Sequence, residues 1–147
     1  MTNEYERDLT AARDQLHAPR EELLGVVDAL SDADLDRSRR GGWTVRRVLE
    51  HVIQSEWLYA RLVLHLRDRP VPDDLVSGAP SSAVEARQRL EASREALLAA
   101  LDGVDEASFY RLRTVGHEEY SILSVLENDA NHDREHAEQV RVILSAD

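Results

Sequence analysis

Four segments of this chain carry apolar residues three and four positions apart, which is the spacing of one face of an α-helix. They predict helices over residues 4–30, 44–67, 82–102 and 121–144. No segment shows a convincing alternation of apolar and polar residues, so no β-sheet is expected. A length of 147 residues suits one domain, which we expect to span residues 1–147. The pattern therefore predicts an all-α fold, a four-helix bundle.

Local signals predict where the helices begin. Thr44 is placed to cap the second helix, and Ser82 with Glu85 forms an S-x-x-E capping sequence at the third. Ser31 with Asp34 is typical of a short capped turn after the first helix. Pro19 interrupts the first helix, so we expect either a kink or a break at that point.

The segment between the second and third helices, residues 67–81, is rich in proline and glycine and reads as a linker. At about 3.3 Å per residue, this segment is long enough to cross the length of a bundle.

Composition excludes several classes of function. The net charge of −11 disfavours binding to nucleic acid phosphates, so no nucleic-acid partner is expected. No apolar run approaches ~18 residues, and the acidic N-terminus lacks the apolar core of a secretory signal. We therefore expect a cytoplasmic protein without a membrane partner. Cysteine is absent, so any thiol in its chemistry must arrive as a cosubstrate.

The last predicted helix carries an apolar stripe with a polar middle. Along that face the residues read Ile, Val, Asp, His, His, Val and Ile, with Asp129, His132 and His136 at the centre. Burying these polar groups without partners would cost several kcal/mol. Two imidazoles one helical turn apart can converge on one divalent ion at ~2.0–2.1 Å, which would provide such a partner.

The second predicted helix has an interrupted stripe of the same kind, in which His51 stands among Val48, Ser55 and Leu58. Three His from two helices would hold Zn²⁺ or a similar ion and leave positions open for water or substrate. The alternative is that these His are ordinary surface residues, because pairs four apart are common on polar helices.

Five further residues lie near the three His in sequence and are candidates for supporting them. Their alternative role is an ordinary hydrogen bond on or between helices. They are Asp129, Asn128, Gln139, Ser55 and Glu56.

Two motifs carry a resemblance to a known family. The segment "GGWTVRRVLEHVIQSE" resembles the second-helix signature of the DinB/YfiT-like superfamily, and "HDREHAEQV" resembles its fourth-helix signature. The resemblance implies a bundle with up-down-down-up order and a long connection between helices two and three. It also implies a divalent metal on three side chains, which by motif position are His51, His132 and His136.

The resemblance further implies a function, since relatives include transferases and isomerases that use low-molecular-weight thiols. A metal, Zn²⁺ in the first place and Ni²⁺ as an alternative, would lower the pKa of such a thiol and present the reactive thiolate. We therefore expect a metal-dependent S-transferase acting on small electrophiles, and the family favours a homodimer. Two alternatives stay open: a non-catalytic metal-binding or dimerising bundle, and a metal-dependent hydrolase with Glu56 or Asp129 as general base.

Overall fold

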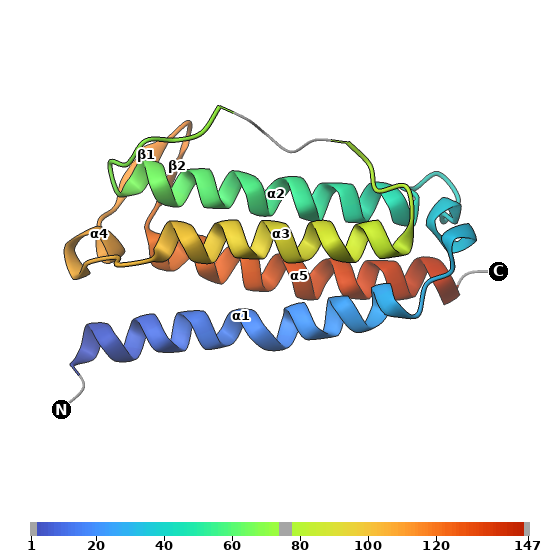
Figure 1. Cartoon of the computed structure of the whole chain (residues 1–147), viewed down its shortest axis with the longest axis horizontal. Coiled ribbons are helices and arrows are strands. Elements are labelled where there is room, and N and C mark those ends of the chain that lie inside the picture. Colours follow the sequence, from blue (N-terminus) through green and yellow to red (C-terminus); the bar gives the residue numbers. More distant parts are fainter. Residues whose placement is uncertain (1–2, 74–77, 146–147) are drawn as a thin grey trace.

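Four long helices lie side by side along one axis in the computed structural model, which describes residues 3–73 and 78–145 (Figure 1). They are α1 (Glu4–Asp28), α2 (Val45–Leu66), α3 (Ala83–Leu101) and α5 (Ile122–Ser145). α1 and α5 run in one direction, and α2 and α3 run in the other. This is the predicted four-helix bundle with up-down-down-up order.

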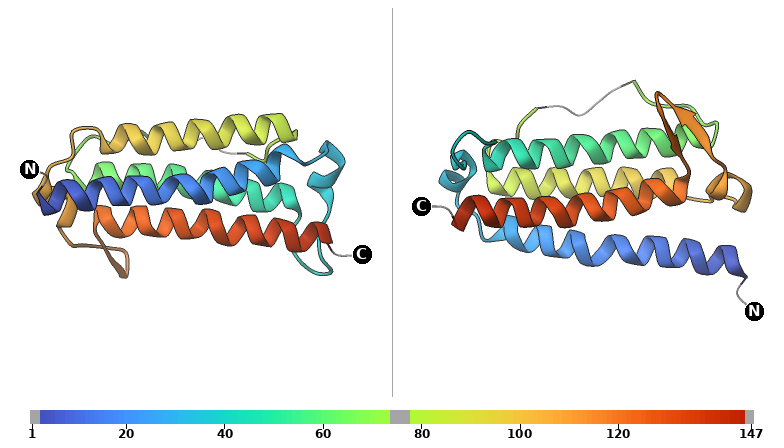
Figure 2. Two further views of the ribbon diagram at one scale, coloured as in Figure 1. Left: turned by 90° about the horizontal axis from the view of Figure 1, so that it is seen from below. Right: turned by 180° about the vertical axis from the view of Figure 1, so that it is seen from behind.

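The long connection follows from this order. Because α2 and α3 are parallel, α3 begins at the end of the bundle opposite to the one where α2 ends (Figure 1). The chain must return over the full length of the bundle between them, as predicted. The most extensive helix contacts are those of α1 with α5 and of α2 with α3, followed by α2 with α5 (Figure 2).

Hydroxyl caps fix the helix starts. The Thr44 hydroxyl accepts a hydrogen bond from the backbone N–H of Arg47 at 3.1 Å, and the Ser82 hydroxyl accepts one from the N–H of Glu85 at 3.0 Å. Each bond satisfies a backbone donor that the first helical turn leaves free. The capping at Ser82 is one-sided, because the Glu85 carboxylate accepts instead from the hydroxyl of Ser81 at 2.5 Å.

Pro19 lies inside α1, which continues through it as a single helix. The predicted alternative of a break at this residue is therefore wrong. Proline lacks one backbone N–H and disturbs the preceding turn, at a cost of ~3 kcal/mol in a helix interior. Pro19 is buried in the bundle, so tertiary packing of α1 offsets this cost.

Three short elements lie outside the long helices, besides the 3₁₀ turn η1 (Asp32–Asp36), which Ser31 caps as predicted. They are α4 (Glu106–Tyr110), β1 (Arg113–Val115) and β2 (Glu118–Tyr120). The strands form an antiparallel hairpin in which Val115 pairs with Glu118. The expectation of no strand was wrong here. Gly116 opens the two-residue turn with a φ of 67°, which glycine adopts without strain.

The buried interior divides into two apolar clusters along the bundle axis. Between them each long helix contributes buried or nearly buried polar side chains, which we call the charge layer. Its members are Arg20, Glu56, Ser93, Arg94, Asp129 and Asp133. None of the helices in the described ranges combines the length and apolarity that crossing a membrane requires.

Candidate metal centre

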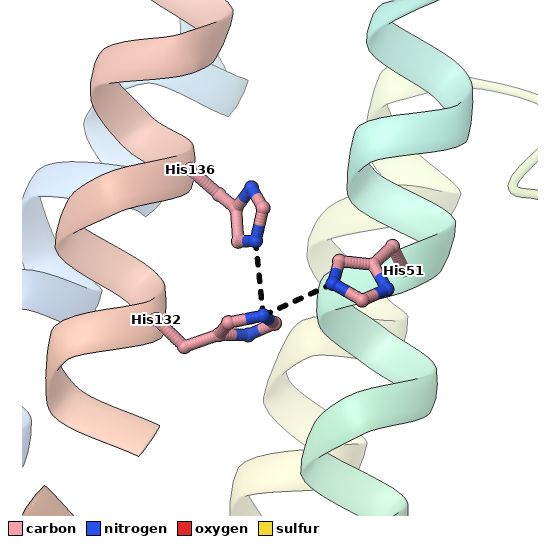
Figure 3. Close-up of side chains that lie close together, drawn as sticks. All are labelled: His51, His132 and His136. Atoms are coloured by element: carbon pink, nitrogen blue, oxygen red, sulfur yellow. Dashed lines mark hydrogen bonds between the residues drawn. The ribbon is translucent and has the colours of Figure 1, made fainter. Parts of the chain in front are cut away.

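Three imidazoles from two helices meet on one side of the bundle (Figure 3). His51 comes from α2, while His132 and His136 come from α5. The Nε2 atom of His132 lies 3.0 Å from Nε2 of His51 and 2.9 Å from Nε2 of His136. All three side chains are half-buried, so the group, which we call the His triad, is reachable from solvent on one side.

Helix geometry explains this convergence. His132 and His136 are four residues apart, so they stand one above the other on one face of α5. His51 lies on the face of α2 that packs against α5, in the stripe where it replaces an apolar residue. The two interrupted stripes therefore face each other.

Hydrogen bonds among the described side chains do not satisfy all of these nitrogens at once. The Oε1 atom of Gln139 lies 2.6 Å from Nδ1 of His136, and an amide oxygen only accepts, so Nδ1 carries the proton and Nε2 of neutral His136 presents a lone pair. The single hydrogen or lone pair on Nε2 of His132 can serve only one of its two neighbours. Its other nitrogen, Nδ1, is buried without a hydrogen-bond partner in the described structure.

A divalent cation fits this donor set. Three neutral imidazoles bound to one ion at ~2.0–2.1 Å in tetrahedral geometry would hold their nitrogens roughly 3.3 Å apart. The two Nε2 contacts of His132 are already close to that separation. An ion would bind the lone pairs of all three Nε2 atoms at once. Hydrogen bonds between the rings cannot do the same in any combination of tautomers, because Nε2 of His132 can serve only one of its two neighbours.

The surroundings favour the neutral form of the imidazoles. Burial, followed by the neighbouring His136 and His51, lowers the pKa of His132 to about 4. Burial also lowers the pKa of His51, with His136 and Arg47 adding to the effect. Neutral imidazole is the form that binds metal, so both residues are ready as ligands at neutral pH.

Trp43 forms a wall beside the triad. Its ring packs edge-on against the ring of His51, with centroids 5.3 Å apart. The guanidinium of Arg47 lies 5.0 Å from the centroid of the same indole, and Arg47 also pairs with Glu50 at 2.8 Å. These contacts position Trp43 although 43% of it is exposed.

The charge layer lies next to the triad in sequence and has a different chemistry. Arg20 donates to both carboxylate oxygens of Asp133, at 2.9 and 3.0 Å, and lies 3.0 Å from a carboxylate oxygen of Glu56. Arg94 bonds Glu56 and Asp133 at 2.9 Å each, and Asp129 at 3.4 Å. Two guanidiniums thus face three buried carboxyl groups.

A proton on Asp129 balances these charges. Burial and the hydrogen bond to Glu56 raise the pKa of Asp129 well above its ordinary value. Burial opposes ionisation of Glu56, but its hydrogen bond from Asp129 and the charges of Arg20 and Arg94 prevail, lowering its pKa to about 2. With Asp129 protonated, two carboxylates balance two guanidiniums. The three carboxyl groups are close enough to hold an ion, but Arg20 and Arg94 already occupy the position of a cation beside them.

Of the five candidate supporting residues, only Gln139 hydrogen-bonds an imidazole of the triad within the described part of the chain. Asp129 and Glu56 lie in the charge layer. Asn128 is exposed, and Ser55 is half-buried. Sequence reasoning missed Arg20 and Arg94 as partners of these carboxylates. Each interrupts an apolar stripe of its own helix, as the His do, and this was the available signal.

Comparisons with known proteins agree with the fold and motifs. A family model described as the DinB superfamily matches residues 15–140. The crystal structure of TT2238, described as a four-helix bundle protein, superposes with a TM-score of 0.69 at 24% identity and covers 90% of this chain and 96% of its own. A DinB-like protein from Bacillus cereus ATCC 10987 gives a TM-score of 0.67 at 19% identity, covering 93% and 88%. No curated protein sequence matches this chain.

Proposed function

The chain belongs to the DinB superfamily, and from this membership together with the convergence of three imidazole nitrogens we propose that it is a metal-dependent enzyme. The proposed reaction transfers a low-molecular-weight thiol to a small electrophile. The His triad would bind Zn²⁺, or alternatively Ni²⁺. The observation that carries the proposal is the placement of three Nε2 atoms around one point, where hydrogen bonds among the described side chains do not satisfy them all.

The chain's own residues would prepare the site. His51, His132 and His136 bind through Nε2, and Gln139 holds the ring of His136 in the required tautomer. Trp43 covers one side of His51 and limits the access of water there. When bound, the metal lowers the pKa of a thiol and so supplies a thiolate at neutral pH. The absence of cysteine in the chain agrees with a thiol that comes from outside.

Hydrolysis is the weaker alternative, because it needs a general base beside the metal. Glu56 and Asp129 are the carboxyl groups suggested for that role. Glu56 accepts from Ser93 at 2.6 Å and from Arg94 at 2.9 Å and has a lowered pKa, so it is a poor base. Asp129 is 1% exposed, and its carboxyl group is already engaged by Glu56 and Arg94.

The test compares the metal content of purified wild-type protein with that of His132→Ala and His136→Ala. His65→Ala is the matched control, because His65 lies on α2 but outside the triad. Wild type and the control should retain metal, and both triad variants should lose it. Equal metal content in all four proteins would make the triad assignment wrong.

Thermal melting with Zn²⁺, Ni²⁺ and small thiols then tests the reaction class, because a ligand that binds the native state raises the melting temperature. A thiol should stabilise the metal-loaded wild type and not the triad variants. Full metal occupancy without binding or turnover of any thiol would instead favour the non-catalytic bundle. In that case the metal would serve stability, and the protein would act through a partner or as a homodimer.

A further inference from the structure

A cavity of about 420 Å³ lies beside the His triad, between α5 and the loop that precedes α2. Its size falls within the range of small-molecule sites. The residues that define its chemistry come from both segments. They are Arg39, Trp43, Glu135, Glu138, Gln139 and Val142.

Two of these residues connect the cavity directly to the triad. Trp43 packs its ring against His51, and Gln139 hydrogen-bonds His136. A ligand in the cavity would therefore contact the same side chains that hold and cover the imidazoles.

The cavity presents charges of both signs. Arg39 and Glu135 form no ion pair in residues 3–73 and 78–145. Most other arginines of the described chain, by contrast, pair with a carboxylate. Glu138 is partly offset, with its carboxylate 3.6 Å from Arg141. The cavity is thus bordered by one cation, Arg39, and one anion, Glu135, that lack an ion-pair partner in the described residues. Its other lining includes the indole of Trp43 and the aliphatic side chain of Val142.

We propose that this cavity binds the charged part of the thiol cosubstrate, a small zwitterion of the amino-acid class. Its carboxylate pairs with Arg39 and its ammonium group with Glu135, while its sulfur points toward the His triad. The inference rests on the proposed function, since it assigns the cosubstrate of the same metal centre. It adds a recognition site that distinguishes a zwitterionic thiol from a simple alkyl thiol.

Three probes separate the contributions in calorimetric titrations of zinc-loaded protein. S-methylcysteine carries both charges but no free thiol, cysteamine is a thiol with only the ammonium group, and 3-mercaptopropionate is a thiol with only the carboxylate. Arg39→Gln should weaken S-methylcysteine and 3-mercaptopropionate about fivefold, the effect of one exposed ion pair, and leave cysteamine unchanged.

Glu135→Gln should weaken S-methylcysteine and cysteamine by a similar factor and leave 3-mercaptopropionate unchanged. Arg40→Gln is the matched control, because Arg40 is exposed next to Arg39 but does not line the cavity. This control should bind all three probes like wild type. Zinc content measured after each titration verifies that no probe has removed the metal.

The outcomes separate the two proposals. If both thiols bind equally well to wild type, Arg39→Gln and Glu135→Gln, the thiol site remains but the cavity proposal is overturned. If S-methylcysteine binds and depends on both residues while neither thiol binds the zinc-loaded protein, the proposed function fails and the assignment of a thiol to the cavity fails with it. Charge-dependent binding of all three probes supports both.

Discussion

Oε1 of Gln139 lies 2.6 Å from Nδ1 of His136, less than one turn further along α5. This contact fixes the proton on Nδ1 and turns Nε2 toward the other two imidazoles. Partners of this kind typically contribute a factor of about 10–100 to metal affinity. Gln139→Leu should therefore weaken zinc binding by roughly that factor, measured by competition with a chelator. Gln139→Glu keeps an acceptor and should bind at least as tightly as wild type. Equal affinity in the Leu variant would contradict an orienting role.

Acid should release the metal only well below the ordinary imidazole pKa of 6.5. Protons compete with metal for each nitrogen, and burial lowers the pKa of both His51 and His132, so competition begins at a lower pH. Metal content after equilibration at a series of pH values measures the release. Release of half of the metal at or above pH 6.5 would show that the site does not protect its imidazoles from protonation.

The metal-free protein should lose stability as the pH falls from 6.5 toward 4. In this window the unfolded chain protonates the imidazole of His132, while the native state, with a pKa of about 4, does not. Stability is thus fully present above pH 6.5. Urea unfolding of wild type and His132→Asn across this range measures the effect, and the variant should show a shallower fall. His65→Asn, which removes a histidine of α2 outside the triad, is the control.

Asp129→Asn should preserve the fold, because an amide can donate to Glu56 and accept from Arg94 as the protonated acid does. The raised pKa of Asp129 means that the native state keeps a proton that the unfolded chain releases above its ordinary pKa of 3.8. Wild-type stability therefore falls with rising pH by up to about 1.4 kcal/mol per pH unit relative to the variant. Urea unfolding at several pH values tests this. A stability difference that is constant with pH would mean that Asp129 is ionised.

Asp133→Asn should behave in the opposite way and destabilise the protein strongly. It removes the charge that meets both Arg20 and Arg94, leaving buried guanidiniums without full compensation. The expected loss is about 3–5 kcal/mol, measured by urea unfolding at neutral pH. Glu22→Gln is the comparison, since it breaks the exposed pair with Arg141 and should have little effect. Similar losses of stability in both variants would show that burial of the charge layer does not increase the cost of breaking its ion pairs.

Cap chemistry explains why helix starts were predictable from sequence. Thr44 and Ser82 bond to backbone donors three residues ahead, so their effect is local and can be read without tertiary structure. The β1–β2 hairpin was missed because strands of three residues are too short to show alternation. Gly116 at the first turn position was the signal that was present.

The convergence of the three imidazoles was also predictable from the interrupted stripes of the two helices. Their role as metal ligands stays a prediction. The partners of Asp129 were not predictable in the same way. A polar residue in an apolar stripe indicates that a partner exists but not which helix supplies it. The choice of Arg94 and Glu56 depends on how far each helix is displaced along the bundle axis, and sequence spacing within one helix carries no such information.

This axial displacement is what the charge layer controls. A slide of α2 along α5 by one turn would move Glu56 about 5.4 Å away from Arg20 and Arg94, the guanidiniums that it shares with Asp133, and leave buried charges without full compensation. Apolar contacts alone would tolerate such a slide far better, because one leucine can replace another. The layer therefore fixes the axial register of the helices. It keeps His51 at the same height along the bundle axis as His132 and His136, although none of its described side chains hydrogen-bonds an imidazole. Loss of the layer would therefore misalign the metal site before the bundle unfolds.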